Sequence, residues 1–351
     1  MTIAVLPKVG LPAKATPRLK KIAFEEHFSA DAIMSPGVAV NPEKHAANLG
    51  LEVELTRILL DRLRDLHCAR IEEMDAAGID IAVLSLQAAG IEGIADAHEA
   101  INRSRKINDF LANEVQRSNG RFAGFASVPL QDPQAAAAEL RRAVLELGFV
   151  GVMVNGYVSK PDGGAWYLDD ARFMPFWQTV SDLAVPVYIH PRPSLPAVQD
   201  ALYAGHPELV GATWGFAPET ATHALRLVYS GLFDRFPKVQ VILGHMGETL
   251  PFFAWRIQHC FEYNPLGHQV ERRLQDYLAD NFYITTSGNC SDQALICALL
   301  TVGADRICFS TDYPYERSDE AARWIERAPI SEGDRRKIAH GNAAKLFNLR
   351  P

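Results

Sequence analysis

The sequence has few cysteines and no run of apolar residues long enough to cross a membrane. Its five cysteines are odd in number, and none of them form a CxxC pair. This pattern argues against a disulfide framework and predicts reduced thiols in a cytoplasmic protein. The alternative of a thiol nucleophile would need a partnered histidine, and no local motif supports it. Because no stretch of about 18 apolar residues occurs, we expect no membrane contact.

Phosphate-binding motifs are missing as well. No GxGxxG follows a predicted strand and no GxxxxGK[ST] occurs, which argues against dinucleotide and P-loop sites. The net charge is −7 without a long basic run, which argues against a nucleic-acid partner. The N-terminal segment has Pro7, Pro12 and Pro17 but no acidic residue and no apolar signal-peptide core. We therefore expect residues 1–20 to form an arm outside the folded domain.

Short apolar runs rich in β-forming residues alternate with longer segments of helical spacing. The helical segments include Leu55–Met74 and Leu140–Leu147, where apolar residues recur three or four positions apart. Strands that are apolar throughout and separated by helices are typical of a parallel sheet covered by helices. The predicted strands are Lys21–Phe28, Ile81–Leu86, Phe122–Val128, Phe149–Asn155, Val185–His190, Val239–His245, Phe282–Thr286 and Ile307–Thr311.

Eight such units favour a closed barrel over an open sheet. The predicted fold class is therefore α/β, a (βα)₈ TIM barrel, with residues 21–351 as a single catalytic domain. Two connections are long: Ser29–Glu54 follows the first strand, and 191–217 follows the fifth. Both leave the carboxyl ends of strands, where barrel active sites form, so we expect lids or binding loops rather than solvated insertions.

A carboxylate and an imidazole share one face of the first strand. Alternate side chains of a strand point the same way, so Glu25 and His27 face one side and Glu26 the other. Such a pair can chelate a divalent ion. By itself this signal is weak, because Glu-x-His also occurs on protein surfaces.

Four more polar residues stand at or just after the ends of later strands. His190 ends the fifth strand, His245 and Glu248 follow the sixth, and Asp312 follows the eighth. Three of them have an ordinary alternative: a core histidine for His190, a charge near a helix N-terminus for Glu248, and a cap or turn residue for Asp312. Because strand ends meet at one face of a barrel, one shared site explains them together.

The number of strand-end residues predicts a single metal ion. Beyond Glu25 and His27, each contributing strand supplies one ligand candidate. The fourth strand ends in Val152–Asn155, without an acid or lysine that could bridge a second ion. One metal with four protein ligands can still accept a substrate.

The motifs together resemble the decarboxylase branch of the amidohydrolase superfamily, which acts on hydroxylated benzoates such as 2,6-dihydroxybenzoate (γ-resorcylate), 2,3-dihydroxybenzoate, salicylate and 5-carboxyvanillate. The resemblance runs from about Lys21 to Leu349. It is carried in order by Lys21–Phe28, Leu130–Pro133, Gly148–Gly151, Tyr188–Arg192, Ser230–Pro237, Leu243–Glu248, Ile284–Asn289 and Phe309–Pro314.

The resemblance implies a metal-dependent amidohydrolase-type barrel and a reversible, non-oxidative decarboxylation. Glu25, His27, His190 and Asp312 are the implied ligands of one divalent ion, Zn²⁺ or Mn²⁺. The implied substrate is a small aromatic carboxylate such as 2,6- or 2,3-dihydroxybenzoate. No organic cofactor is expected, because the phenol itself accepts the electrons. The family also implies a homodimer or homotetramer.

Roles for the remaining site residues follow from the same resemblance. Asp312 is expected to protonate the ring carbon, and His245, supported by Glu248, to bind a ring hydroxyl or the leaving carboxylate. His27 is kept here, as in the γ-resorcylate branch, whereas some fungal relatives have alanine. Departures surround the expected ring pocket: Tyr313-Pro314-Tyr315 replaces Trp-Pro-Phe, and Pro193 replaces an asparagine.

Three further residues are candidate substrate contacts. Arg256 is expected to bind charge near the site or across a subunit contact, with a surface ion pair as its alternative. Phe28 and Tyr315 are expected to pack the substrate ring, with core packing as theirs. The apolar loop near Trp214 and Phe216 is a candidate subunit contact.

Two other functions remain compatible with a metal barrel. One is a hydrolase of a lactone or amide, whose products would gain water instead of losing CO₂. The other is a non-catalytic metal-binding module. The lack of a second-metal bridge favours the decarboxylase over the hydrolase, and the full ligand set argues against the module.

Overall fold

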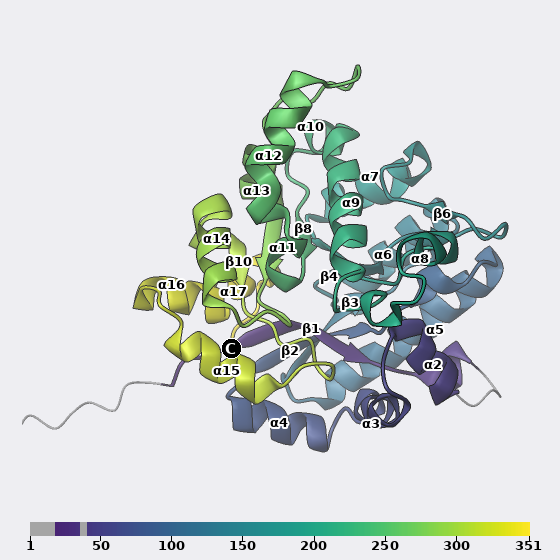
Figure 1. Cartoon of the computed structure of the whole chain (residues 1–351). Coiled ribbons are helices and arrows are strands. Elements are labelled where there is room, and N and C mark those ends of the chain that lie inside the picture. The colour runs from purple at the N-terminus through teal and green to yellow at the C-terminus, as the bar shows by residue number, and fades with distance from the viewer. Residues whose placement is uncertain (1–17, 36–40) are drawn as a thin grey trace, which may run out of the picture.

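The computed structural model describes residues 18–35 and 41–351, and its centre is one eight-stranded parallel sheet. Neighbouring strands follow the order β1-β2-β3-β4-β7-β8-β9-β10. A backbone bridge between Glu26 and Tyr313 joins β1 to the segment after β10, which closes the sheet into a barrel (Figure 1). The strands are β1 (Ile22–Phe28), β2 (Ile81–Leu86), β3 (Phe122–Ala126), β4 (Gly151–Asn155), β7 (Val187–His190), β8 (Val241–Leu243), β9 (Phe282–Thr285) and β10 (Ile307–Cys308).

Each of these strands lies inside a predicted range, so the prediction of a (βα)₈ barrel is confirmed. A small antiparallel hairpin, β5 (Val158–Ser159) and β6 (Ala165–Trp166), stands apart from the barrel. Helices surround the sheet (Figure 1). They are α1 (Asp31–Met34), α2 (Pro42–Leu49), α3 (Val53–Arg64), α4 (Ala69–Ala77), α5 (Ala97–Arg117), α6 (Pro133–Leu145), α7 (Met174–Leu183), α8 (Pro196–Leu202), α9 (Phe216–Tyr229), α10 (Leu232–Arg235), α11 (His245–Glu248), α12 (Leu250–Tyr263), α13 (Leu274–Asn281), α14 (Asp292–Val302), α15 (Ser318–Arg327), α16 (Glu332–Arg336) and α17 (Asn342–Phe347).

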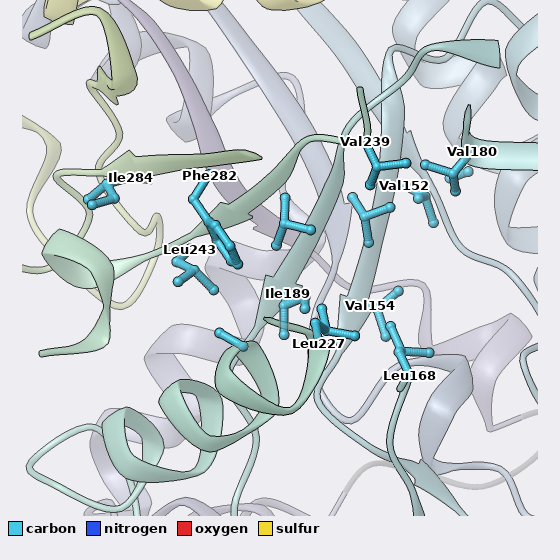
Figure 2. Close-up of a cluster of buried hydrophobic side chains, with 14 of the residues drawn as sticks. Val152, Val154, Leu168, Val180, Ile189, Leu227, Val239, Leu243, Phe282 and Ile284 are labelled. Carbon is cyan, nitrogen blue, oxygen red and sulfur yellow. The ribbon is translucent and has the colours of Figure 1, made fainter. Parts of the chain in front are cut away.

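The apolar side chains form two clusters, one on each side of the sheet. The outer core fills the space between strands and helices, and Figure 2 shows Val154 and Ile189 of the strands beside Leu227 of α9. The barrel interior contains Phe24, Phe125 and other inward-facing residues of the strands. Because both faces of the strands are buried, their sequences are largely apolar away from the strand ends.

An irregularity in β1 decides which side chains of the first strand point into the barrel. Ala23 pairs with Ala82 and Glu26 with Leu84, so Phe24 and Glu25 together stand opposite one residue of β2. This β-bulge shifts the alternation by one position. Phe24 points into the barrel interior in alternation with Ile22, and the bulge turns Glu25 inward as well, where it contacts Tyr188 of β7.

Short helices interrupt both long connections. The connection after β1 contains α1 and α2, and the one after β7 contains α8. Most of the predicted N-terminal arm lies outside the described residues, so the division into an arm and one domain stays a prediction. Among the described helices, none is both long and apolar enough to pass through a membrane.

Candidate metal centre and active site

Four buried side chains converge where the strands end at one rim of the barrel. One ligand atom from each of Glu25, His27, His190 and Asp312 lies within 4.8 Å of the others. Nε2 of His190 is 3.7 Å from Oε1 of Glu25, and Nε2 of His27 is 3.2 Å from Oδ1 of Asp312. The structure therefore brings together all four ligand candidates that the sequence indicated, from β1, β7 and the segment after β10.

The residues fit a divalent ion. Oε1 of Glu25 is buried and has no hydrogen-bond partner among the described residues. Two imidazoles and two carboxylates are the mixed donors that Zn²⁺ and Mn²⁺ accept. Nδ1 of His27 lies 3.1 Å from Oγ of Ser85, so this ring already has a neighbour that can fix its orientation.

Burial and charge act in opposite directions on the two carboxylates. Burial raises the pKa of Glu25, the nearby Asp312 adds to this, and His245 and His27 oppose it. Burial also tends to raise the pKa of Asp312, but hydrogen bonds from His245 and His27 outweigh it and hold that pKa well below its usual range. Asp312 is therefore a carboxylate in the free protein, although its environment is buried.

His245 and Glu248 form a hydrogen-bonded pair beside Asp312. Nδ1 of His245 lies 2.7 Å from Oε1 of Glu248, and its Nε2 lies 3.4 Å from Oδ2 of Asp312. Burial tends to lower the pKa of His245, but the charges of Glu248 and Glu25 and the bond to Asp312 raise it well above its usual value. The imidazole accordingly holds a proton within reach of Asp312.

His245 and Asp312 both have left-handed backbone conformations. His245 has φ 50° and Asp312 has φ 71°, and neither residue is glycine. Such conformations persist only where surrounding contacts hold them, and they concentrate at functional sites. Glu248 lies two residues before α12, which begins at Leu250, and its carboxylate turns back to His245.

The three predicted substrate contacts lie in different surroundings. The ring centroids of Tyr315 and His27 are 5.8 Å apart, and the Tyr315 hydroxyl donates to Gln87 at 3.2 Å, so Tyr315 borders the site. Phe28 does not, and that prediction is corrected: alternation turns it outward, where it stacks on Phe110 of α5 at 5.9 Å. Arg256 is exposed on α12 and forms no ion pair within residues 18–35 and 41–351.

A cavity of about 1010 Å³ leads from the site to the surface. At its polar end lie His245, Glu248, Asp312 and Glu316. Its outer walls are largely apolar and come from the loop before α9 and from α12 and α14, with Trp214, Phe216, Phe252, Phe253, Ile296 and Leu300 among the lining residues. An aromatic acid could enter along this path.

Sequence reasoning missed the polar residues that support the cluster. Tyr188 stands two positions before His190 on β7, so alternation would have placed both on the same inward face. Thr285, the last residue of β9, and Ser287 are likewise two positions apart in the sequence. Their contacts to Glu25 join segments far apart in the chain, and no local pattern indicates such contacts.

The barrel and the cluster together define a class of enzyme. Histidine and carboxylate donors gathered at the carboxyl ends of eight parallel strands are the arrangement of metal-dependent (βα)₈-barrel enzymes. The sequence model of the amidohydrolase family matches residues 45–349, and this chain belongs to that family. The family predicted from the sequence motifs is thereby confirmed.

Relatives of known activity are similar over nearly the full chain. The gamma-resorcylate decarboxylase of Polaromonas sp. strain JS666 is 47% identical over 334 residues, which is 94% of this chain and 98% of the relative. The enzyme of the same name from Rhizobium sp. strain MTP-10005 is 46% identical over 333 residues, again 94% of this chain and 98% of the relative.

Solved structures agree in fold. A 2,6-dihydroxybenzoate decarboxylase complexed with 2,6-dihydroxybenzoate has TM-score 0.87 and 45% identity, covering 95% of this chain and 100% of its own. The dihydroxybenzoic acid decarboxylase of Polaromonas sp. JS666, with bound manganese and the inhibitor 2-nitroresorcinol, has TM-score 0.87 and 46% identity, covering 95% and 98%. The 5-carboxyvanillate decarboxylase of Sphingomonas paucimobilis has TM-score 0.85 and 32% identity, covering 95% and 100%.

Proposed function

We propose that this chain is a metal-dependent, non-oxidative decarboxylase of an ortho-hydroxylated benzoate, with 2,6-dihydroxybenzoate as the first substrate to test. The observation that carries the proposal is the buried cluster of Glu25, His27, His190 and Asp312 in a chain 47% identical to a gamma-resorcylate decarboxylase. The reaction replaces the carboxylate on the ring by a proton and releases CO₂. Carboxylation of the phenol is the reverse reaction and is expected at high bicarbonate.

Glu25, His27, His190 and Asp312 would hold one Mn²⁺ or Zn²⁺ ion. A bound divalent ion would act there as a Lewis acid that favours the phenolate form of the substrate, which enriches the ring carbon in electrons. The partnerless Oε1 of Glu25 supports this assignment. No organic cofactor is needed, because the phenol ring itself accepts the electron pair.

Asp312 donates the proton to the carboxylate-bearing ring carbon. The ring carbon becomes tetrahedral, the bond to the carboxylate breaks, its electron pair restores the ring, and CO₂ leaves. Asp312 lacks a proton in the free protein, and His245 can pass one across the 3.4 Å contact only once the bound substrate displaces water and raises the pKa of Asp312. Glu248 keeps His245 oriented through its 2.7 Å contact with Nδ1.

The binding of the substrate carboxylate involves a second copy of the chain. Apart from the imidazolium of His245, no cationic side chain appears among the described residues that line the cavity, whereas Glu248, Asp312 and Glu316 do. Arg256 lies exposed on α12 together with the exposed Phe252 and Trp255. We infer a homodimer or homotetramer in which this helix faces a partner and Arg256 attracts the substrate's negative charge. Tyr315 packs the substrate ring beside His27.

A cytoplasmic location is part of the proposal, and the state of the thiols supports it. All five cysteines are free, and a cytoplasmic protein keeps its thiols reduced.

The activity is tested with a panel of hydroxybenzoates. Protein loaded with Mn²⁺ is incubated with 2,6- and 2,3-dihydroxybenzoate, salicylate and 5-carboxyvanillate, and loss of the aromatic acid is followed by absorbance together with CO₂ release. We expect one member to give CO₂ and the corresponding phenol in equal amounts. Bound metal without turnover of any member would overturn the proposal, and hydrolysis of an aryl lactone or amide by the same preparation would favour a hydrolase instead.

A further inference from the structure

Three hydroxyl groups contact the same oxygen of Glu25. Oε2 accepts hydrogen bonds from the hydroxyls of Tyr188, Thr285 and Ser287, and the Thr285 contact measures 3.2 Å. Oγ1 of Thr285 also lies 3.2 Å from the Tyr188 hydroxyl and 2.6 Å from Oγ of Ser287. All three residues are buried, and we call them the hydroxyl cradle. Oε2 is therefore saturated with donors.

The other oxygen of the same carboxylate has a different environment. Oε1 has no hydrogen-bond partner in the described part of the chain, although it is buried. It lies 3.7 Å from Nε2 of His190 and 3.8 Å from Nε2 of His245. A buried carboxylate oxygen left without a donor is costly unless a cation meets it. Oε2 of Glu25 is thus bound by protein hydroxyls, whereas Oε1 is left facing the metal-ligand cluster.

The space around Glu25 is closed on another side by backbone. A Cβ atom added to Gly244 would stand 2.9 Å from both carboxylate oxygens and 3.0 Å from the Tyr188 hydroxyl. Such distances leave no room for a side chain, so the end of β8 packs directly against the carboxylate. The cradle on one side and Gly244 on another leave Glu25 little freedom to rotate.

We infer that Tyr188, Thr285 and Ser287 are positioning residues that make Glu25 offer a single oxygen, Oε1, to the ion. The inference rests on the proposed metal site and deepens it. A carboxylate that gives one oxygen occupies one position on the ion instead of two, which leaves room for the substrate's phenol and carboxylate oxygens. The cradle residues contact Glu25 and are not among the four clustered ligand candidates, so their effect is on how tightly and in what arrangement the ion is held.

The test measures Mn²⁺ binding rather than turnover. Metal-free protein is titrated with Mn²⁺, and free Mn²⁺ is read from its electron paramagnetic resonance signal. We expect Tyr188→Phe to raise the Kd for Mn²⁺ about tenfold or more, since losing an outer-shell partner typically costs that much. Thr285→Val should act in the same direction, whereas Thr285→Ser keeps the hydroxyl and should restore tight binding.

Tyr283→Phe is the matched control. Tyr283 also lies in the barrel interior, but its ring packs under Arg306 and it does not contact Glu25. Removing the Tyr283 hydroxyl should leave the Kd for Mn²⁺ and the spectrum of bound Mn²⁺ unchanged. Ser287→Ala is the second variant in case Tyr188→Phe does not fold, with thermal unfolding of the metal-free proteins measured alongside.

The outcomes separate the cradle from the proposed function. Wild-type protein that binds Mn²⁺ and decarboxylates, with cradle variants that bind Mn²⁺ equally well and give the same spectrum, would overturn the cradle alone. Wild-type protein that binds no Mn²⁺ would overturn both. Weaker Mn²⁺ binding by folded cradle variants, with an unchanged Tyr283→Phe control, supports the inference.

Discussion

At the scale of single residues, neighbours decide the chemical state of each acid in this barrel. Asp312 and Glu92 are both buried carboxyl groups. Histidine partners hold the pKa of Asp312 well below its usual range, whereas burial raises the pKa of Glu92 to about 7. The same side-chain chemistry therefore gives a carboxylate at Asp312, whereas the carboxyl group of Glu92 loses its proton only near pH 7.

Replacing the proposed proton donor should remove turnover while keeping the fold. In Asp312→Asn the amide retains an oxygen near His27 but has no carboxyl proton to donate. We expect kcat for the best substrate to fall by about 10²–10⁴, the usual contribution of general acid catalysis. The comparison variant is Asp319→Asn, which changes an acid of α15 outside the cluster. Full activity of Asp312→Asn, with metal content determined in parallel, would contradict the assignment.

Glu92 makes the protein less stable as the pH rises. Its pKa is raised from 4.5 to about 7 by burial, against hydrogen bonds that include the Asn155 amide. Between these values the unfolded chain releases a proton that the folded protein keeps, so the free energy of unfolding falls with pH up to about 7 and then levels off. Below pH 4.5 both states are protonated and the group has no effect.

Glu92→Gln should remove that dependence. Relative to wild type, the variant should gain stability between pH 4.5 and 8, reaching roughly 3 kcal/mol, because burial raises the pKa of Glu92 from 4.5 to about 7. Urea unfolding at pH 4.5, 6 and 8 measures this difference. The exposed Glu146→Gln should show no such trend. A constant difference between Glu92→Gln and wild type at all three pH values would show that Glu92 does not titrate as described.

At the scale of secondary-structure elements, strand ends and one bulge build the site. Phe24 alternates with Ile22 into the barrel interior, and the bulge in β1 then turns Glu25 and His27 inward to join the cluster. The apolar strands hold these ends in place because helices pack against their outer side. In Figure 2 the side chain of Leu227 on α9 lies among strand residues such as Ile189 and Val154.

Shortening Leu227 should loosen the contact between α9 and the barrel. Leu227 is completely buried, so Leu227→Ala removes apolar contacts and leaves a cavity. We expect a loss of about 2–5 kcal/mol in the free energy of unfolding. Denaturant unfolding at fixed metal content measures it. Leu145→Ala makes the same substitution at a leucine that is 70% exposed and should change stability little. Equal effects of the two substitutions would contradict the packing described here.

At the scale of the whole molecule, the mouth of the cavity opens beside an exposed apolar surface. Phe252, Trp255 and Tyr263 of α12 and Leu300 of α14 are each more than two thirds exposed. Exposed apolar patches of this kind are typical of protein contact surfaces. Since Arg256 lies on the same helix, a second copy that covers α12 would bring a cation close to a cavity end rich in acids.

A charge placed on this surface should separate the copies. We expect wild-type protein to elute as a dimer or tetramer in size-exclusion chromatography with light scattering, and Trp255→Glu to shift it towards the monomer. Leu145→Glu, on the exposed end of α6, should leave the mass unchanged. Arg256→Ala should keep the oligomer and raise KM. Wild-type protein with the mass of one chain would contradict the proposed assembly.

The sequence by itself determined the eight strands, their parallel arrangement and the identity of the four clustered residues. These follow from local regularities: apolar runs separated by helical spacing, a two-residue period along β1, and polar residues at strand ends that must meet at one rim. The same period turns Phe28 away from His27, so the strand pattern itself places Phe28 in the outer core instead of at the substrate ring.

Only the tertiary structure decided how those residues interact. The contact of His245 with Asp312, the hydroxyl cradle around Glu25 and the bulge in β1 all depend on distances between strands remote in the chain. Whether each pKa is raised or lowered depends on the same distances, because burial and neighbouring charges compete within a few ångströms. No pattern along the sequence carries that information.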